Sequence, residues 1–323
     1  MHVPVLFDEV MTALRPRSGG RYLDCTLGGG GHTQGILTRS APDGRVLATD
    51  ADAEATRRVA ALDLIPGQDA GDQARLQLRQ CWLDETPALV RALGFLPLDG
   101  VLIDLGLSSF QLDEPRRGFA FMRDGPLDMR FDQARGLAAA DWIDQQDAGE
   151  LTRVLREYGD VPHAARVTEA IWAARPIRTT AQLRDVVAKV TKTRSSKIHP
   201  ATLVFQALRI AVNDELRRLQ TALPELIGLL APSGRMAVIT FHSLEDRIVK
   251  EVFRRESRDV VAQVGFGVQE ERRSRVRLVN KDPIVPAAEE VAANPRSRSA
   301  KLRVAERLQD GEGASDGASE GDR

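Results

Sequence analysis

The chain has 323 residues, of which 42% are hydrophobic and 28% are charged, and its formal net charge is −1. This composition is typical of a soluble globular protein and excludes a disordered chain, while two cysteines are too few for a disulfide-stapled module. No apolar run approaches the roughly 18 residues of a membrane-spanning helix, and the N-terminal segment lacks the features of a signal sequence, so we expect a cytoplasmic protein.

Apolar segments in the first third of the chain predict four strands, with helical patterns between the first three. The strands are expected at 21–25, 45–50, 75–78 and 100–104. Alternating strands and helices indicate an α/β fold with a parallel, doubly wound sheet, which binds ligands at the carboxyl ends of its strands.

The loop after the first strand contains four consecutive glycines in the segment DCTLGGGGHT, from Asp24 to Thr33. Ordered glycine runs mark positive φ or a surface where no Cβ fits, so this loop is expected to present backbone N–H groups to a small molecule. The dinucleotide spacing GxGxxG fails because Thr33 and Gln34 stand where its last glycine is required. A phosphate loop fails because Ile36 replaces its lysine.

Carboxylates end two of the later predicted strands. Asp50 lies about 20 residues after the loop, where an acid can hold two ribose hydroxyls. Asp104 ends the fourth strand. With the glycine loop, these acids suggest S-adenosylmethionine, a nucleoside that carries a methionine tail and no pyrophosphate. The alternative is a glycine-rich surface turn beside unrelated acids.

The middle of the chain, 113–200, shows amphipathic helical patterns without a strand between them. It is interpreted as an all-helical insertion that recognises the substrate, the alternative being a purely structural cap. The sheet domain would then comprise 1–112 and 201–307, and the Gly-, Ser- and Asp-rich tail at 308–323 is expected to be disordered.

The second part of the sheet domain is expected to resume the alternation of helices and strands. Its predicted elements are a long helical pattern from 202, a short helix at 224–230, a turn at 233–234, strands at 235–241, 275–279 and 301–305, and a helix at 243–255.

Charge is distributed unevenly along the chain. Residues 175–218 include ten basic and three acidic residues, and residues 272–307 include ten basic and four acidic residues. The final segment, 308–323, includes one basic and five acidic residues. A basic stripe is usually a solvated face, but two of them beside a nucleoside site favour a polyanionic substrate. Four cations are expected to approach phosphate, namely Arg296, Arg298, Lys301 and Arg303. The alternative is that 301–305 is an edge strand whose charges are solvated.

Seven long motifs resemble the ribosomal small-subunit RNA (cytosine-N4) methyltransferases, the RsmH or MraW family. They are HVPVLFDEV at 2–10, TLGGGGHT at 26–33, DLGLSSFQLD at 104–113, RGFAFMRDGPLDMRFD at 117–132, IHPATLVFQALRIAVNDEL at 198–216, TFHSLEDRIVK at 240–250 and NPRSRSAKLR at 294–303. The resemblance implies a class I, Rossmann-like methyltransferase fold with a helical insertion. It also implies S-adenosylmethionine as donor and, as acceptor, a cytosine in the decoding region of 16S ribosomal RNA within the small subunit.

The resemblance also carries over individual cofactor contacts. The contacts with the methionine end are Gly30, Gly31 and His32, and the ribose contact is Asp50. Trp82 would stack on the adenine, and Asp104 and Gln111 lie in the segment that bridges cofactor and target base. Trp82 stands where the family often has Phe, and a core aromatic is its alternative role. The chain departs from the family at Phe110, Leu203 and 158–166, which concerns the base-binding loop and RNA contacts rather than the donor site.

The chemistry can be argued from the residues themselves. Methylation at carbon 5 of a pyrimidine needs a cysteine nucleophile, and neither Cys25 nor Cys81 lies in a plausible catalytic loop, so an N-methyl or O-methyl product is favoured. No metal-ligand spacing is present, and no metal is expected. The candidates for orienting an exocyclic amine are Asp104 with Ser108 and Ser109, and then His242 at the end of the strand 235–241.

Each candidate has an alternative role. Asp104 could bind cofactor only, Ser108 and Ser109 could cap a turn, and His242 could cap the following helix. At the level of function, the alternatives are a non-catalytic RNA-binding assembly factor and a methyltransferase that acts on DNA or protein.

Overall fold

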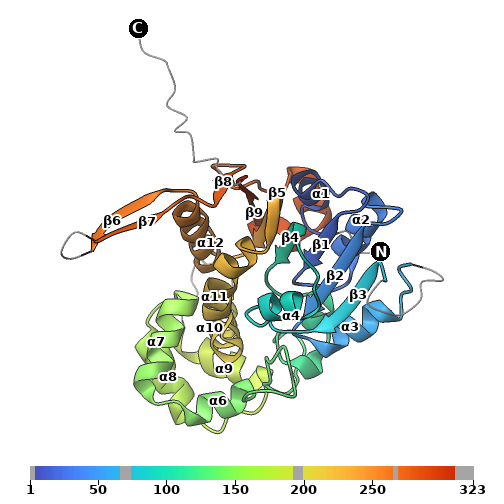
Figure 1. The fold of residues 1–323 in the computed structure, drawn as a ribbon. Helices are drawn as coiled ribbons and strands as arrows, with labels where there is room; N and C mark the ends of the chain where they lie inside the picture. The colour runs from blue at the N-terminus through green and yellow to red at the C-terminus, as the bar shows by residue number, and fades with distance from the viewer. Residues whose placement is uncertain (1–3, 66–73, 192–198, 265–267, 310–323) are drawn as a thin grey trace. The chain divides into compact units, whose positions relative to one another are not determined.

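The computed structural model describes residues 4–65, 74–191, 199–264 and 268–309, with side chains for all of them except 260–264 and 268–272. The chain divides into two compact units (Figure 1). The sheet unit consists of Met1–Gly106 and Arg218–Arg323, and the helical unit consists of Leu107–Arg217.

The sheet unit contains a seven-stranded sheet of order β3-β2-β1-β4-β5-β9-β8. Its strands are β1 (Arg21–Asp24), β2 (Arg45–Asp50), β3 (Leu76–Gln80), β4 (Leu98–Asp104), β5 (Leu230–Thr240), β8 (Val276–Leu278) and β9 (Lys301–Arg307). The first five strands run parallel, whereas β9 pairs antiparallel with both β5 and β8. The α/β fold expected from the sequence is confirmed, but the sheet is mixed rather than wholly parallel, because β9 pairs antiparallel with the edge of β5 and with β8.

The helices beside these strands are α1 (Phe7–Leu14), α2 (Gly31–Arg39), α3 (Ala53–Ala60), α4 (Thr86–Ala92), α11 (Glu215–Ile227) and α12 (Ser243–Glu256), followed later by α13 (Ala288–Ala293) and the 3-10 turn η2 (Pro295–Ser299). Helices α2 and α3 connect the first three strands as the sequence predicted, and further helices precede, separate and follow the other strands. A hairpin of β6 (Val260–Val264) and β7 (Val268–Arg272), which the sequence did not predict, forms a separate two-stranded sheet (Figure 1).

Three details differ from the sequence-based expectation. The helical pattern from 202 is two helices, because Asp214 adopts left-handed backbone with φ of 53° between them. Pro224 lies inside α11 instead of starting a new helix, since the buried residues around it hold the helix together. The turn expected at 233–234 is an irregularity within β5, where Ser233 has a φ of 63°.

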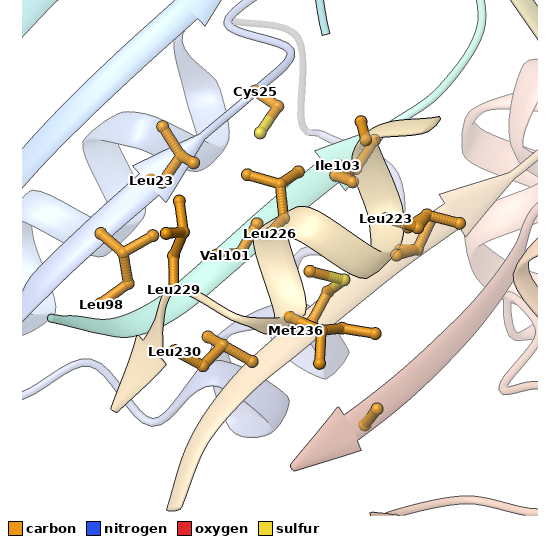
Figure 2. Close-up of a cluster of buried hydrophobic side chains, with 14 of the residues drawn as sticks. Leu23, Cys25, Leu98, Val101, Ile103, Leu223, Leu226, Leu229, Leu230 and Met236 are labelled. Atoms are coloured by element: carbon orange, nitrogen blue, oxygen red, sulfur yellow. The ribbon is translucent and has the colours of Figure 1, made fainter. Parts of the chain in front are cut away.

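The sheet unit has a buried cluster on each face of its sheet, one against α11 and the other against α1 and α2. Figure 2 shows leucine, valine and isoleucine side chains from β1 and β4 meeting leucines of α11 and Met236 of β5. Residues that are fully buried here include Leu23, Val101, Ile103, Leu226 and Met236. Each such side chain contributes about 1.5–3 kcal/mol by leaving water, so this layer holds the strand ends in fixed register.

The helical unit has a core of its own. Its elements are α5 (Ser109–Asp113), η1 (Pro115–Arg117), α6 (Ala139–Gln145), α7 (Ala148–Gly159), α8 (Ala164–Ala173), α9 (Thr180–Val190) and α10 (Pro200–Asn213). A Cβ on Gly159 would lie 2.5 Å from the carbonyl oxygen of Leu203, so glycine lets α7 end directly against α10. This contact explains why the compact helical unit extends to Arg217, beyond the insertion expected at 113–200.

Two further points concern the chain as a whole. Within the described ranges, none of the helices is sufficiently long and apolar to cross a membrane. The tail expected to be disordered at 308–323 lies outside the described residues from 310 onward.

Candidate functional site

The carboxyl ends of neighbouring parallel strands bring three aspartates to one edge of the sheet. Asp50, Asp24 and Asp104 are the last residues of β2, β1 and β4, which are adjacent in that order. The sequence predicted this placement for Asp50 and Asp104. This is the edge at which open α/β sheets bind ligands.

The glycine loop begins directly after β1 and is held by its own backbone. Gly28 and Gly30 have φ of 50° and 80°, a region that glycine adopts without steric cost. A Cβ on Gly31 would lie 2.4 Å from Cγ of Pro4, and a Cβ on Gly30 would lie 3.0 Å from the side chain of Val59. Glycine at position 30 is therefore favoured by backbone conformation and by close packing, and glycine at position 31 by close packing alone.

Asp50 organises the loop from the end of β2. Its Oδ2 accepts a hydrogen bond from the backbone N–H of Gly28 at 2.9 Å, and its Oδ1 accepts one from Asp52 at 2.8 Å. Burial raises the pKa of Asp50 to about 6, and these two donors oppose part of the shift. An ionised carboxylate has about four acceptor sites, so Asp50 retains capacity for ligand hydroxyls.

Asp24 is a structural residue that sequence reasoning did not single out. It is 1% exposed, and its carboxylate accepts hydrogen bonds from the hydroxyl of Thr33 at 2.7 Å and the backbone N–H of Thr26 at 3.1 Å. The Thr26 hydroxyl in turn accepts the backbone N–H of Asp104 at 2.6 Å. This chain of hydrogen bonds ties the first turn of α2 to the ends of β1 and β4. An acid followed two residues later by Thr was its only signal in the sequence.

Asp104 and His32 lie side by side at the end of β4. His32 Nε2 is 3.7 Å from Asp104 Oδ2, beyond hydrogen-bonding distance. Asp104 Oδ1 is buried without a hydrogen-bond partner, whereas His32 makes a hydrogen bond with the backbone of Val5. Burial, followed by the negative charges of Asp24 and Glu245, raises the pKa of Asp104 to about 8. Burial also lowers the pKa of His32 to about 4, so both groups favour their neutral forms.

Part of the N-terminal segment covers this pair. The ring of Phe7 stacks on His32 with centroids 6.0 Å apart, and a Cβ on Gly35 would lie 2.5 Å from the Phe7 ring. The backbone N–H of Leu6 donates to Glu290 of α13 at 2.9 Å, which fixes the start of α1. The sequence could not reveal this contact, since it joins residues 284 positions apart.

Trp82 follows β3 and is 8% exposed. The guanidinium of Arg218 lies 4.1 Å from the centroid of its ring, and Arg218 also pairs with Asp84. One face of the indole thus carries a cation. A planar ligand would have to use the other face or displace Arg218.

His242 serves as the N-cap of α12. Its Nδ1 accepts the backbone N–H of Glu245 at 3.4 Å, while Glu245 Oε2 accepts the backbone N–H groups of Phe241 and His242 at 2.7 and 3.2 Å. The structure thus shows the capping role for His242. Because Nδ1 accepts a hydrogen bond within the cap, its lone pair is engaged in this conformation.

Ser108, Ser109 and Gln111 belong to the helical unit. Ser108 and Gln111 form a capping box at the start of α5, in which the Ser108 hydroxyl accepts the Gln111 N–H at 3.3 Å and Gln111 Oε1 accepts the Ser108 N–H at 3.0 Å. Ser109 is the first residue of that helix. The loop that follows Asp104 is therefore locally ordered.

Two of the four cations expected to meet phosphate are paired inside the sheet unit. Arg303 and Lys301 lie 2.7 and 3.2 Å from the carboxylate of Asp246. The single carboxylate of Asp246, on α12, offsets one of these two positive charges. Arg296 and Arg298 lie on the exposed turn η2 and remain candidates for phosphate contact.

Both cysteines of the chain are buried. Cys25 and Cys81 are 4% and 9% exposed, and burial raises the pKa of the Cys25 thiol well above its usual value. Across the part of the chain that the structure describes, no group of three His, Cys, Asp or Glu residues is placed to hold a metal ion. Neither a reactive thiolate nor a metal centre accounts for the described edge of the sheet.

Comparison with known proteins places the chain in a family. The model of the MraW methylase family matches residues 1–308. Proteins named ribosomal RNA small subunit methyltransferase H are similar over nearly their full length. They include those of Thermomicrobium roseum (48% identity, 95% of this chain and 94% of the relative), Citrifermentans bemidjiense (48%, 95% and 98%) and Magnetococcus marinus (44%, 95% and 98%). The chain therefore belongs to the MraW methylase family.

Proposed function

We propose that this protein transfers the methyl group of S-adenosylmethionine to N4 of a cytidine in the decoding region of 16S ribosomal RNA. The observation that carries the proposal is the near full-length similarity to proteins named ribosomal RNA small subunit methyltransferase H. We further propose that the reaction takes place in the cytoplasm, on an assembled or nearly assembled small subunit.

The residues at the carboxyl edge fit the donor. Asp104 Oδ1 is a buried polar atom without a hydrogen-bond partner, as expected where a polar ligand completes the site. The loop containing Gly30 and Gly31 would hold the methionine end, and Asp50 the ribose hydroxyls. Trp82 would lie beside the adenine. Gln111 would contact the donor as part of the protein segment that bridges donor and target base. When bound, S-adenosylmethionine supplies an electrophilic methyl group on a sulfonium.

The amine of cytosine is a poor nucleophile because its lone pair is delocalised into the ring, so orientation is the main task of the protein. Alignment of two reactants can remove up to roughly 7–11 kcal/mol of a barrier in well-oriented systems. Asp104 is the first candidate to accept a hydrogen bond from the amine and thereby turn its lone pair, since its Oδ1 has no other partner.

Other side chains take secondary roles in this proposal. Ser108 and Ser109 would shape the loop that receives the base, as part of the ordered start of α5. His242 would act on the base only if Nδ1 left its capping hydrogen bond with Glu245. The helical unit would recognise the surrounding RNA, with Arg296 and Arg298 of the sheet unit contacting phosphate.

The two cysteines support nitrogen over carbon 5 as the methylated atom. Methylation at carbon 5 requires a thiolate that attacks the ring. Both cysteines of the chain are buried, and Cys25 has a raised pKa, which disfavours the thiolate.

The test is transfer from labelled S-adenosylmethionine to small ribosomal subunits that lack the modification, with naked RNA, DNA and total protein as parallel acceptors. The proposal expects label only in small-subunit RNA. Preferential labelling of DNA or protein would contradict it. Donor binding without transfer, together with full rescue of a deletion strain by Asp104→Ala, would instead favour a non-catalytic assembly factor.

A further inference from the structure

Helix α12 carries three exposed cations along one side. Arg247, Lys250 and Arg254 follow one another at spacings of three and four residues, which places them above each other on the same side of the helix. The opposite side is buried in the sheet unit and includes Val249 and Phe253. The three cations thus face solvent as a row, the α12 stripe.

The cations of the α12 stripe make no ion pair or side-chain hydrogen bond with any other residue in the described part of the chain. An exposed acid, Glu251, lies between Lys250 and Arg254 on this side of the helix without pairing with either of them. Like charges three or four residues apart destabilise a helix, and the helix dipole favours cations only in the last turn. Helix stability therefore does not account for Arg247 and Lys250.

The remaining acids of α12 are engaged by other groups. Asp246 lies within ion-pair distance of two cations of β9, and Glu256 lies within ion-pair distance of two arginines. Glu245 is buried and accepts backbone N–H groups of the helix cap. Because Asp246 and Glu256 each face two cations, the surroundings of the α12 stripe add positive charge rather than remove it.

Helix α12 begins at the edge of the sheet that carries the proposed donor site. It follows β5, in which Ile239 pairs with Asp104 of β4. Asp246, in its first turn, meets the start of β9, whereas Glu256, its last residue, meets Arg275 just before β8. Because β8 begins opposite the end of β9, α12 runs from the carboxyl edge toward the other edge. The α12 stripe therefore leads away from Asp104 over about 10 Å, at 1.5 Å per residue.

We propose that the α12 stripe binds the phosphate backbone of the ribosomal RNA that leads to the target cytidine. The inference rests on the proposed function, which supplies an RNA acceptor at the edge where α12 begins. A row of unpaired cations matches a chain of phosphates. A membrane surface or an apolar protein groove fits less well, because none of the residues of α12, all of them described, exposes a large hydrophobic side chain. The stripe would hold and orient the RNA, while the base is chosen elsewhere.

The test is the binding of small ribosomal subunits that lack the modification to the triple variant Arg247→Gln, Lys250→Gln and Arg254→Gln, at several salt concentrations. Each phosphate contact with a single strand contributes about −0.7 to the slope of log affinity against log salt concentration. The triple variant should lose about 2 units of this slope and, at about 0.1 M salt, bind subunits about 100-fold more weakly. Its KM for subunits should rise, while donor affinity and kcat at saturating subunits stay within about 3-fold.

Two variants on the same helix separate charge from helix structure. The double variant Arg247→Lys with Arg254→Lys keeps both charges, so its affinity for subunits should stay within about 3-fold of that of the unaltered protein. Glu251→Gln removes the exposed acid on the same side, so it should bind subunits at least as tightly as the unaltered protein.

A matched control removes three positive charges elsewhere. Arg15 after α1, Arg57 of α3 and Arg91 of α4 are exposed and lie outside α12. Replacing all three by Gln changes the net charge by the same amount as the triple variant. This control should weaken subunit binding by less than about 5-fold, because only long-range attraction is lost.

The inference is overturned if the triple variant keeps the affinity and salt slope of the unaltered protein, or if the matched control loses as much. It is also overturned if Glu251→Gln weakens binding as much as the triple variant, or if duplex DNA competes for the protein better than 16S ribosomal RNA. Should the triple variant bind the donor poorly, Arg254→Gln alone decides, with an expected 5-fold loss of affinity, approximately, and a slope reduced by about 0.7.

These outcomes are separable from the proposed function, because subunit binding is measured without methyl transfer. Binding through the α12 stripe by a protein that transfers no methyl group to cytidine would uphold the inference while the methylation assignment failed. Formation of N4-methylcytidine by a triple variant with unaltered affinity would uphold the assignment while the inference failed.

Discussion

Replacing Asp104 by Asn should stabilise the free protein, and the gain should grow with pH. The ordinary pKa of the carboxyl is 3.8, and burial with its two acidic neighbours raises it to about 8 in the folded chain. Between these values the folded state holds a proton that the unfolded state has lost. Stability therefore falls as pH rises, by at most about 1.4 kcal/mol per pH unit.

The magnitude follows from the size of that window. At pH 7 the raised pKa would lower the free energy of unfolding by at most about 4 kcal/mol. The actual loss is smaller, because 25% of the Asp104 side chain is exposed to solvent. We expect Asp104→Asn to raise the free energy of unfolding by about 1–3 kcal/mol at pH 7. Such a gain is typical where an ionisable group is kept for function at the expense of stability.

Urea unfolding at pH 6, 7 and 8 measures this effect. Asp43→Asn is the matched control, because its carboxyl has a lowered pKa and stays ionised across this range, so its difference from the unaltered protein should not vary with pH. The reasoning is refuted if Asp104→Asn is less stable than the unaltered protein at pH 8, or if its advantage does not increase from pH 6 to pH 8.

Three other substitutions test separate parts of the account. Arg235→Met should lower the free energy of unfolding in urea by about 1–3 kcal/mol, since it removes the buried 2.8 Å partner of Glu306 and leaves that carboxylate only the more exposed Arg277. Arg39→Met at an exposed pair should cost under about 1 kcal/mol, and equal losses would contradict this. The double variant Cys25→Ala with Cys81→Ala should keep methyl transfer within about 5-fold in the labelled-donor assay, and loss of transfer from a folded variant would restore a thiol mechanism. The donor affinity of Trp82→Phe, measured by calorimetry, should lie within about 3-fold of that of the unaltered protein, and that of Trp82→Ala should be at least about 10-fold weaker. Equal affinities of the two variants would show that Trp82 does not contact the adenine.

The strands at the centre of the sheet unit could be predicted because apolar runs bounded by Gly and Asp are unambiguous. The expected strands at 45–50 and 100–104 end at the same residues as β2 and β4. The hairpin of β6 and β7 was missed because its two five-residue strands carry no strong alternation.

The site was predictable only where chain order determines geometry. Asp50 and Asp104 follow strands, so their shared edge follows from the parallel topology. The approach of Phe7 to His32, and of Asp246 to Arg303, depends on packing between distant segments, which no local spacing encodes. Both contacts change an interpretation: the first buries a neutral histidine, and the second compensates a cation expected at phosphate.

The most direct test of the central claim is the identity of the nucleoside formed. Small subunits that lack the modification would be incubated with the protein and S-adenosylmethionine, and the 16S ribosomal RNA digested and analysed by chromatography and mass spectrometry. We predict N4-methylcytidine at close to one per subunit, confined to the decoding region. The appearance of 5-methylcytidine, or no methylated cytidine at all, would contradict the account.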